Sequence, residues 1–268
     1  MNTGRRDLKT GRKGNVSPSL PVITLLTDFG TADYFVGAVK GAILSVNPAA
    51  VIADITHEIP AQDISAGAFT LLAAYKTFPA GTTHVAVVDP GVGSSRRPVI
   101  VNANEQYFVG PDNGLFTYIY DREPSHRIFH ITSESYFRPE PSSTFHGRDI
   151  FAPVAAALSQ GVAPEEFGPE INDEVRLPSL ETPLRIIHID RFGNCITNIT
   201  RDGLKSGEAL VINGRTITEF RNFYGEGSAT EPFAIWGSAG FLEISVAGGS
   251  AAKTLGAKRG DPVLVSPR

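Results

Sequence analysis

The sequence predicts a mixed α/β fold: an N-terminal, largely parallel sheet flanked by helices, then a smaller C-terminal antiparallel β-barrel domain. Two observations carry this prediction. In residues 22–161, short apolar segments rich in β-branched residues alternate with longer segments of helical spacing, which is typical of parallel strands joined by covering helices. Beyond about residue 184 the helical spacing vanishes, and short strands separated by turn residues follow, which is typical of a small barrel or sandwich.

The expected elements follow in order along the chain. Helix ends are marked by Asn47-Pro48, Pro79 and Gly161, which are common helix stops. The N-terminal strands are expected at 22–26, 50–56, 83–90, 98–104 and 106–110, the last two as a hairpin, and the helices at 34–46, 63–78, 114–120 and 149–161. The C-terminal strands are expected at 184–190, 195–200, 208–214, 215–220, 232–238, 241–247 and 261–266.

A polar segment with two prolines, residues 172–183, is the expected linker. The predicted division is an α/β domain over 21–178 and a β-barrel domain over 184–268. Residues 1–20 are basic, polar and rich in Gly and Ser without an apolar segment, so we expect a disordered basic tail rather than a secretory signal. A functional basic arm is the alternative.

The composition narrows the class of protein. The 268 residues carry a formal net charge of −4, which argues against nucleic acid as a partner. No apolar run approaches the roughly 18 residues that a membrane span needs, so no membrane partner is expected. The single cysteine, Cys195, excludes an intrachain disulfide framework and fits a reducing, cytoplasmic location.

Acidic residues follow the expected strands at the sheet edge where ligands of open α/β sheets gather. Asp28 and Asp33 follow the first strand, and Asp89 follows the third. The Gly-rich loop after Asp89 brings back Arg96, whose guanidinium would keep that carboxylate ionised. A structural ion pair that only fixes the loop is the alternative, and the pattern leaves both open. The neighbouring Arg97 is expected to point to solvent.

His146 is the histidine whose setting suggests a function. It precedes an Ala-rich helix, stands beside Gly147, and is followed by Asp149, which can complement the first helical turn. No group of His, Cys and Asp residues has zinc-site spacing. In the C-terminal half, a turn holds a carboxylate, an aromatic ring and an amide, at Asp190, Phe192 and Asn194; a simple hairpin is the favoured interpretation.

Known motifs for other chemistries are absent. The chain has no dinucleotide-binding, phosphate-loop or nucleophile-elbow motif. The tripeptide Asp28-Phe29-Gly30 matches the metal-binding tripeptide of protein kinases. A kinase, however, needs a Gly-rich loop, a strand lysine and a catalytic loop upstream of it, and Asp28 lies too close to the start of the regular pattern.

Taken together, six segments resemble the S-adenosyl-L-methionine (SAM) hydroxide adenosyltransferases, relatives of the fluorinating and chlorinating adenosyltransferases. They are LLTDFGTADYFVGAVKG, DITHEIPAQDI, VDPGVGSSRRP, GPDNGLF, FHGRDIFAPVAA and DRFGNCITNI. The resemblance implies an enzyme that hydrolyses SAM to adenosine and L-methionine. Because the sulfonium already activates the leaving group of that reaction, no metal or other cofactor is expected. It also implies a homotrimer that binds SAM between the N-terminal domain of one subunit and the barrel of its neighbour.

The resemblance also implies roles for individual residues. Asp89, Arg96 and His146 match the catalytic group, and either they activate the attacking water or they only position it. Asp28 matches the residue that binds the ribose hydroxyls. The remaining binding positions lie at the methionine end (Asp33, Asp190 and Ser238), at the adenine edge (Asn194), and against the adenine ring (Phe192 and Phe223).

The chain departs from the halogenating branch at several positions. Phe78, Gly81 and Gly147 are taken to match hydroxyl-bearing halide positions, and none carries a hydroxyl. Ala239 replaces an arginine at the methionine end, so the methionine carboxylate has no evident partner. Three rivals remain: a halogenase, a metal-dependent nucleosidase, and a non-catalytic SAM or adenosine sensor.

Overall fold

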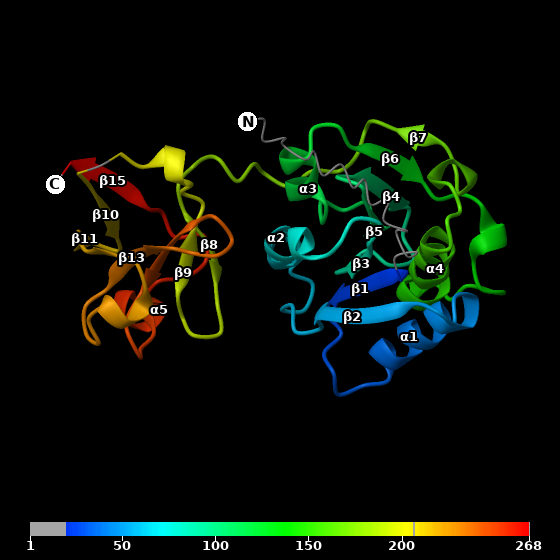
Figure 1. Cartoon of the computed structure of the whole chain (residues 1–268), viewed down its shortest axis with the longest axis horizontal. Helices are drawn as coiled ribbons and strands as arrows, with labels where there is room; N and C mark the ends of the chain where they lie inside the picture. Colours follow the sequence, from blue (N-terminus) through cyan, green and yellow to red (C-terminus); the bar gives the residue numbers. More distant parts are fainter. Residues whose placement is uncertain (1–19, 206, 268) are drawn as a thin grey trace, which may run out of the picture.

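A computed structural model describes residues 20–205 and 207–267 of the chain, which form two units joined by a long crossing segment (Figure 1). The predicted basic tail lies, apart from Leu20, outside the described residues. The first unit contains β1 (Val22–Thr27), α1 (Phe35–Val46), β2 (Val51–Thr56), α2 (Ile64–Ala74), β3 (Thr83–Val87), β4 (Pro98–Ala103), β5 (Gln106–Pro111), α3 (Thr117–Arg122), β6 (Arg127–His130), α4 (Ala152–Ser159) and β7 (Glu170–Ile171).

The seven strands of this unit form one mixed sheet, in the order β2-β1-β3-β5-β4-β6-β7. Strands β2, β1, β3 and β5 are parallel neighbours, whereas β4, β6 and β7 pair antiparallel. The prediction of a largely parallel sheet is confirmed for the half of the sheet that carries the acidic strand ends. The short strands β6 and β7 were not predicted, because two to four residues give too little periodicity to recognise.

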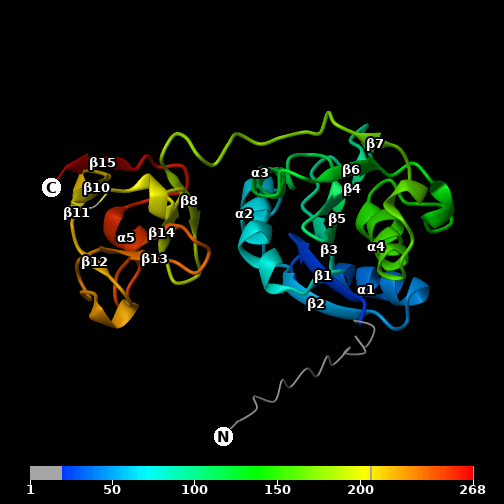
Figure 2. The same ribbon diagram turned by 45° about the horizontal axis from the view of Figure 1, so that its top comes forward.

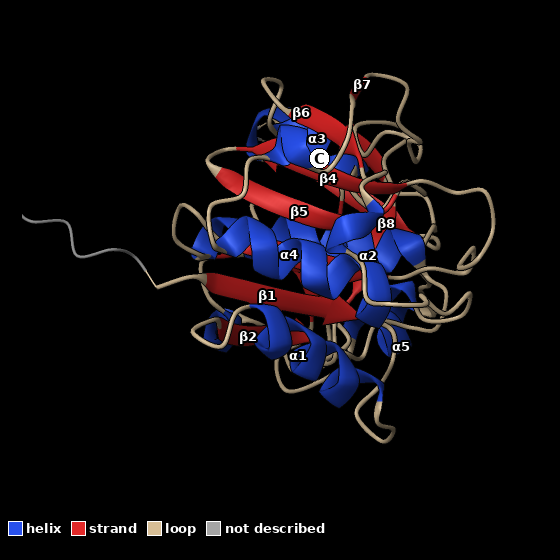
Figure 3. Ribbon diagram, turned by 90° about the vertical axis from the view of Figure 1, so that its right-hand side faces the viewer, coloured by secondary structure: helices blue, strands red, loops and turns tan. Residues whose placement is uncertain are grey.

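Helices cover both faces of the sheet, as predicted (Figure 3). On one face α1 and α4 pack into a core with Ile23 and Leu25 of β1, and on the other α2 and α3 pack into a core with Leu26. Successive residues of a strand point to opposite faces. The apolar run of β1 is therefore continuous because both of its faces are buried.

The second unit contains β8 (Ile186–Ile189), β9 (Cys195–Thr197), β10 (Glu208–Ile212), β11 (Arg215–Ile217), β12 (Phe220–Arg221), β13 (Phe233–Trp236), β14 (Leu242–Ser245), α5 (Ala251–Leu255) and β15 (Leu264–Pro267). These strands form a three-stranded sheet, β11-β10-β15, and a five-stranded sheet, β12-β13-β14-β9-β8. The predicted antiparallel β fold is confirmed, apart from the parallel pair β12–β13. No ladder between the described strands closes the two sheets into one barrel.

Helix α5 was not predicted from the sequence. It has five residues, begins after Ser250, whose hydroxyl accepts a hydrogen bond from the Lys253 N–H at 3.2 Å, and ends at Gly256 with φ +58°. A serine cap and a left-handed glycine therefore determine where the helix begins and ends. With only five residues, it is too short to show a helical spacing of apolar residues in the sequence.

Residues 172–185 cross between the two units as an extended segment (Figure 2). The units also touch directly, because Ile187 and Phe241 of the second unit belong to the apolar cluster of α2. Phe69 of α2 stacks on His188 of β8 with ring centroids 4.9 Å apart. In the described part of the chain, no helix is long and apolar enough to cross a membrane.

His84 gives the core a pH-dependent stability. Its ring is fully buried in β3, lies 4.9 Å from the Phe108 ring, and shares a 2.7 Å hydrogen bond between its Nδ1 and Thr24 Oγ1. Burial lowers the pKa of His84 to about 4, whereas an unfolded histidine titrates near 6.5. As the pH falls from about 6.5 to 4, the unfolded chain binds a proton that the folded chain excludes, so stability falls.

We therefore expect His84 alone to contribute roughly 3 kcal/mol to the loss of stability over that pH range. Urea unfolding of the wild type and of His84→Gln, each at pH 7 and pH 4.5, measures it. The variant should lose less stability between the two pH values than the wild type does. An equal loss in both proteins would contradict the prediction.

Candidate active site

The Gly-rich loop after β3 places a carboxylate and an arginine against the segment that carries His146. Gly93 has φ +77°, and a Cβ on it would lie 2.3 Å from the Ser143 carbonyl oxygen. Only glycine fits there, since any side chain would collide with the backbone of the 142–146 segment. The spacing of glycines in VDPGVGSSRRP thus brings two segments that are 50 residues apart into contact.

Asp89, Arg96 and His146 form one hydrogen-bonded group. Arg96 Nε lies 3.0 Å from both Asp89 carboxylate oxygens, and its Nη2 lies 2.5 Å from Asp89 Oδ2 and 2.7 Å from His146 Nδ1. The Arg96 and Asp89 side chains are only 8% and 5% exposed. A buried, two-pronged pair of this kind holds both groups in fixed positions.

The geometry of this group fixes the proton on His146. A guanidinium can only donate hydrogen bonds, so His146 Nδ1 must accept from Arg96 and the proton of the neutral ring sits on Nε2. Burial and the positive charge of Arg96 both lower the pKa of His146 below its usual value. The ring is therefore neutral at neutral pH, and Nε2 is a hydrogen-bond donor.

A buried acid behind His146 shapes its loop. Asp149 is 1% exposed, and its carboxylate accepts hydrogen bonds from the Ser142 N–H at 2.9 Å and from Arg148 Nε at 2.6 Å. Residues Gly147–Phe151 (η3) form a π-helical turn that leads into α4. Such turns are frequent at functional sites, because the extra residue redirects the side chains around it.

A cavity of about 330 Å³ opens beside this group at the carboxyl ends of β1 and β3. Asp28 follows β1 directly, and its Oδ2 accepts a 2.8 Å hydrogen bond from the Gln62 N–H. The lining combines three acid or base side chains with an aromatic wall: Asp28, Asp89, His146, Phe29, Phe35, Phe145, Gly147, Gln62, Ala61, Val87, Val92 and Thr144. A carboxylate in this cavity can accept hydrogen bonds from a pair of sugar hydroxyls, and the aromatic rings can pack against an apolar surface of the same ligand.

The other predicted binding residues lie away from this cavity. Asp33 is exposed just before α1. Asp190 Oδ2 accepts a 2.8 Å hydrogen bond from Asn194 Nδ2, so these two residues first of all stabilise a turn. Phe192 and Phe223 are 76% and 58% exposed. Ser238 is also exposed, and none of these five residues of the C-terminal unit lines the cavity.

Two sequence interpretations are wrong. Arg97 does not point to solvent: its Nη2 lies 2.6 Å from Asp112, which is buried, and its Nη1 lies 2.7 Å from Asp173. Phe78 and Gly81 do not belong at a halide position, because both precede β3 and so lie at the opposite edge of the sheet from Asp89. Only Gly147 of the three positions lines the cavity.

Sequence reasoning missed Gln62 and the aromatic wall. The left-handed backbone of Gln62, with φ +65°, leaves no mark in the sequence because the residue is not glycine. Phe35 and Phe145 read as ordinary core residues, and only their place at the cavity separates them from the core. In the described part of the chain, no three His, Cys, Asp or Glu side chains are grouped so that they could hold a metal ion.

Both parts of the chain match the domains of one protein family. The SAM hydroxide adenosyltransferase N-terminal domain matches residues 23–168, and the C-terminal domain of that family matches residues 184–264. Proteins named (R)-S-adenosyl-L-methionine hydrolase are similar. The one from Thermus thermophilus is 40% identical over 90% of this chain and 98% of its own length, and the one from Methanocaldococcus jannaschii is 47% identical over 68% of each chain.

A more distant relative and a solved structure are also similar to this chain. A fluorinase from Actinopolyspora mzabensis is 25% identical over 93% of this chain and 98% of its own length. The crystal structure of an uncharacterized conserved protein from Thermotoga maritima superposes with a TM-score of 0.85, at 34% identity over 91% of this chain and 100% of that one. The two matched domains span most of the chain, and therefore the chain belongs to the SAM hydroxide adenosyltransferase family.

Proposed function

We propose that this protein hydrolyses SAM to adenosine and L-methionine. One observation carries the proposal: the hydrogen-bonded group of Asp89, Arg96 and His146, with its buried ion pair, lies at the same cavity as Asp28, at the carboxyl edge of the sheet. Membership of the family supports it, since four relatives at 35–47% identity are named SAM hydrolases and the fluorinases are only 25–27% identical.

The proposed reaction is an in-line displacement at the ribose C5′ atom. A water oxygen forms the new bond to C5′ while the C5′–S bond breaks. The electron pair of the broken bond goes to sulfur and neutralises the sulfonium. Water is a poor nucleophile, so it must be oriented and lose a proton as it attacks. Because the leaving group is already activated by its positive charge, we propose that no metal or other cofactor takes part.

The hydrogen bonds within the group suggest which role each of the three side chains has in the reaction. Since Arg96 occupies His146 Nδ1 and Nε2 carries the proton, we assign the acceptor role at the water to the Asp89 carboxylate. His146 then donates from Nε2 and orients the water oxygen. Arg96 has a second terminal nitrogen, Nη1, that is buried without a hydrogen-bond partner among the described residues, and its charge stabilises developing hydroxide.

Substrate binding is proposed to involve a neighbouring subunit. In the chain itself, Asp28 suits the ribose hydroxyls and Asp33 the methionine end. We propose that the remaining contacts come from a neighbour in a homotrimer: Phe192, Phe223 and Asn194 at adenine, and Asp190 and Ser238 at the methionine ammonium. Support comes from the exposure of both phenylalanines, which leaves their rings free to contact a ligand bound to a neighbouring subunit. A cytoplasmic location stays a prediction from the cysteine count.

Incubation with SAM in ¹⁸O-labelled water tests the proposal. We expect adenosine labelled at the 5′ oxygen, methionine in equal amount, and unchanged turnover when a chelator is present. The relatives are named for the (R) form of SAM, so both sulfonium forms are assayed separately. Formation of 5′-halo-5′-deoxyadenosine with chloride or fluoride would indicate a halogenase. Free adenine released in a chelator-sensitive way would indicate a nucleosidase, and tight binding without turnover a sensor.

A further inference from the structure

An ion pair between the two units of one chain is linked to the cavity through two consecutive residues, Gln62 and Asp63. Arg259, in the turn after α5, places its Nη1 2.5 Å from Asp63 Oδ2. The residue before Asp63 is Gln62, and the Gln62 N–H donates the 2.8 Å hydrogen bond to Asp28 Oδ2. The C-terminal unit therefore holds the turn whose backbone orients the carboxylate at the cavity.

Gln62 adopts a conformation that needs support from its surroundings. Its φ of +65° is unfavourable for a residue with a side chain. The Asp63 N–H is bonded to the Pro60 carbonyl at 3.0 Å, and Asp63 Oδ1 accepts from the Ala66 N–H at 2.9 Å as the N-cap of α2. Arg259 completes this support on the other oxygen of Asp63, so each carboxylate oxygen has its own partner.

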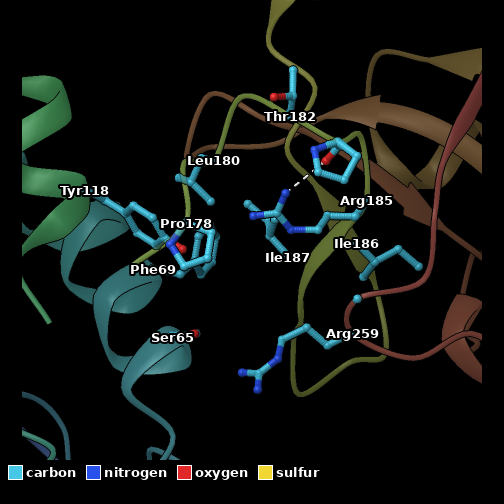
Figure 4. A pocket seen from close by; sticks show the side chains of 12 residues that line it. Ser65, Phe69, Tyr118, Pro178, Leu180, Thr182, Arg185, Ile186, Ile187 and Arg259 are labelled. Atoms are coloured by element: carbon cyan, nitrogen blue, oxygen red, sulfur yellow. Dashed lines mark hydrogen bonds between the residues drawn. The ribbon is translucent and has the colours of Figure 1, made fainter. Parts of the chain in front are cut away.

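Arg259 can serve as a fixed anchor because the residues on both sides of it are hydrogen-bonded within the C-terminal unit. The Gly260 N–H donates to the Ile186 carbonyl of β8 at 2.8 Å, and the Lys258 N–H donates to Asp261 Oδ2 at 2.8 Å. Figure 4 shows the Arg259 side chain extending from this turn toward the end of α2 that carries Ser65. The anchor spans the pocket between the units rather than the catalytic cavity.

We infer that Arg259 is a positioning residue for Asp28, acting through Asp63 and Gln62. The inference rests on the proposed role of Asp28 at the ribose hydroxyls. The Arg259 side chain is 40% exposed, and exposed ion pairs add little stability. The effect is instead geometric: without Arg259, the turn relaxes toward a negative φ at Gln62, and its N–H turns away from Asp28.

The test compares binding of adenosine with binding of 2′,3′-dideoxyadenosine, which lacks the ribose hydroxyls. Calorimetry on the full-length protein gives the ratio of the two Kd values, which is the preference for adenosine. The ratio measured for Asp28→Asn is the reference value for a cavity without this carboxylate. We expect Arg259→Ala to lower the preference for adenosine roughly three- to tenfold. The KM for SAM should rise by the same factor, with kcat within about twofold of wild type.

Three further variants separate positioning from general damage. Arg259→Lys should recover most of the preference. Asp63→Asn keeps an N-cap but loses the ion pair, so it should match Arg259→Ala, and combining the two should add nothing. Arg185→Ala is the control: Arg185 lines the same pocket between the units, and its guanidinium donates to the Pro183 and Ser179 carbonyls, at 2.9 and 3.0 Å. It should lower the melting temperature without changing the preference.

The possible outcomes are distinct. A preference that is lost in Asp28→Asn but unchanged in Arg259→Ala overturns the positioning role alone. An equal loss in Arg185→Ala also overturns it, since packing between the units would then be the cause. If the wild type itself binds both nucleosides equally and does not turn over SAM, the proposed function fails together with the inference.

Discussion

Replacing Asp89 with asparagine is expected to lower kcat for SAM hydrolysis by roughly 10²–10⁴-fold while KM changes little. Asparagine keeps the shape of the side chain and can still accept from Arg96, but its neutral amide cannot take the proton of the attacking water. Arg96→Lys should lose a comparable amount, because an ammonium cannot hold the two-pronged contact with Asp89 and reach His146 at once. Steady-state kinetics with SAM measures both.

Asp173→Asn is the matched control for Asp89→Asn. Asp173 also pairs with an arginine of the same loop, Arg97, but its side chain is 72% exposed and lies outside the cavity. It should leave kcat unchanged. Removing the charge of Asp89 leaves the buried Arg96 guanidinium without its charged partner, so unfolding and SAM binding are measured in parallel. Full activity in Asp89→Asn, or an equal loss in Asp173→Asn, would contradict the assignment of Asp89.

Mixing two inactive variants is expected to restore activity if the site is shared between subunits. In Asp89→Asn the catalytic group is damaged, and in Asn194→Ala the proposed adenine contact is lost on the C-terminal unit. A site built from the N-terminal unit of Asn194→Ala and the C-terminal unit of Asp89→Asn is intact, whereas the opposite combination carries both changes. After denaturation and joint refolding at equal amounts, random assembly leaves about a quarter of the sites intact.

The measured rate of the mixture is compared with each variant refolded alone. Recovery near a quarter of the wild-type rate would support the proposed site between subunits. No recovery, although the refolded mixture is oligomeric, would place Asp89 and Asn194 in the same site or show that Asn194 only stabilises its own turn with Asp190. A mixture of Asp89→Asn with His146→Ala is the control. Both positions lie in one N-terminal unit, so every site stays damaged.

Local patterns were sufficient for most of the fold. The run VITLL predicts β1 because both faces of a parallel strand are buried, and the proline and glycine stops predict where α1 and α4 end. The same patterns failed for β6, β7 and α5, whose few residues carry no periodicity. For α2, the predicted helix over 63–78 changes to a 3₁₀ turn at Tyr75–Thr77, because tertiary packing sets the last turn.

By itself, the sequence determined the class of fold and the residues that reach the carboxyl edge of the sheet. Asp28 and Asp89 follow strands directly, and chain connectivity alone brings the ends of neighbouring parallel strands together. The motifs around them also carried the family resemblance. These are properties of short segments, in which spacing and residue type are sufficient.

Only the tertiary structure decided how the side chains at that edge are paired. The proton on His146, the burial of Arg97 against Asp112, and the path from Arg259 to Asp28 each depend on contacts between residues far apart in the chain. Arg96 and Arg97 are adjacent and identical in type, yet the first faces Asp89 and the second faces the crossing segment at Asp173. Their roles differ because packing directs neighbouring side chains of a loop to different partners, which residue type and spacing do not encode.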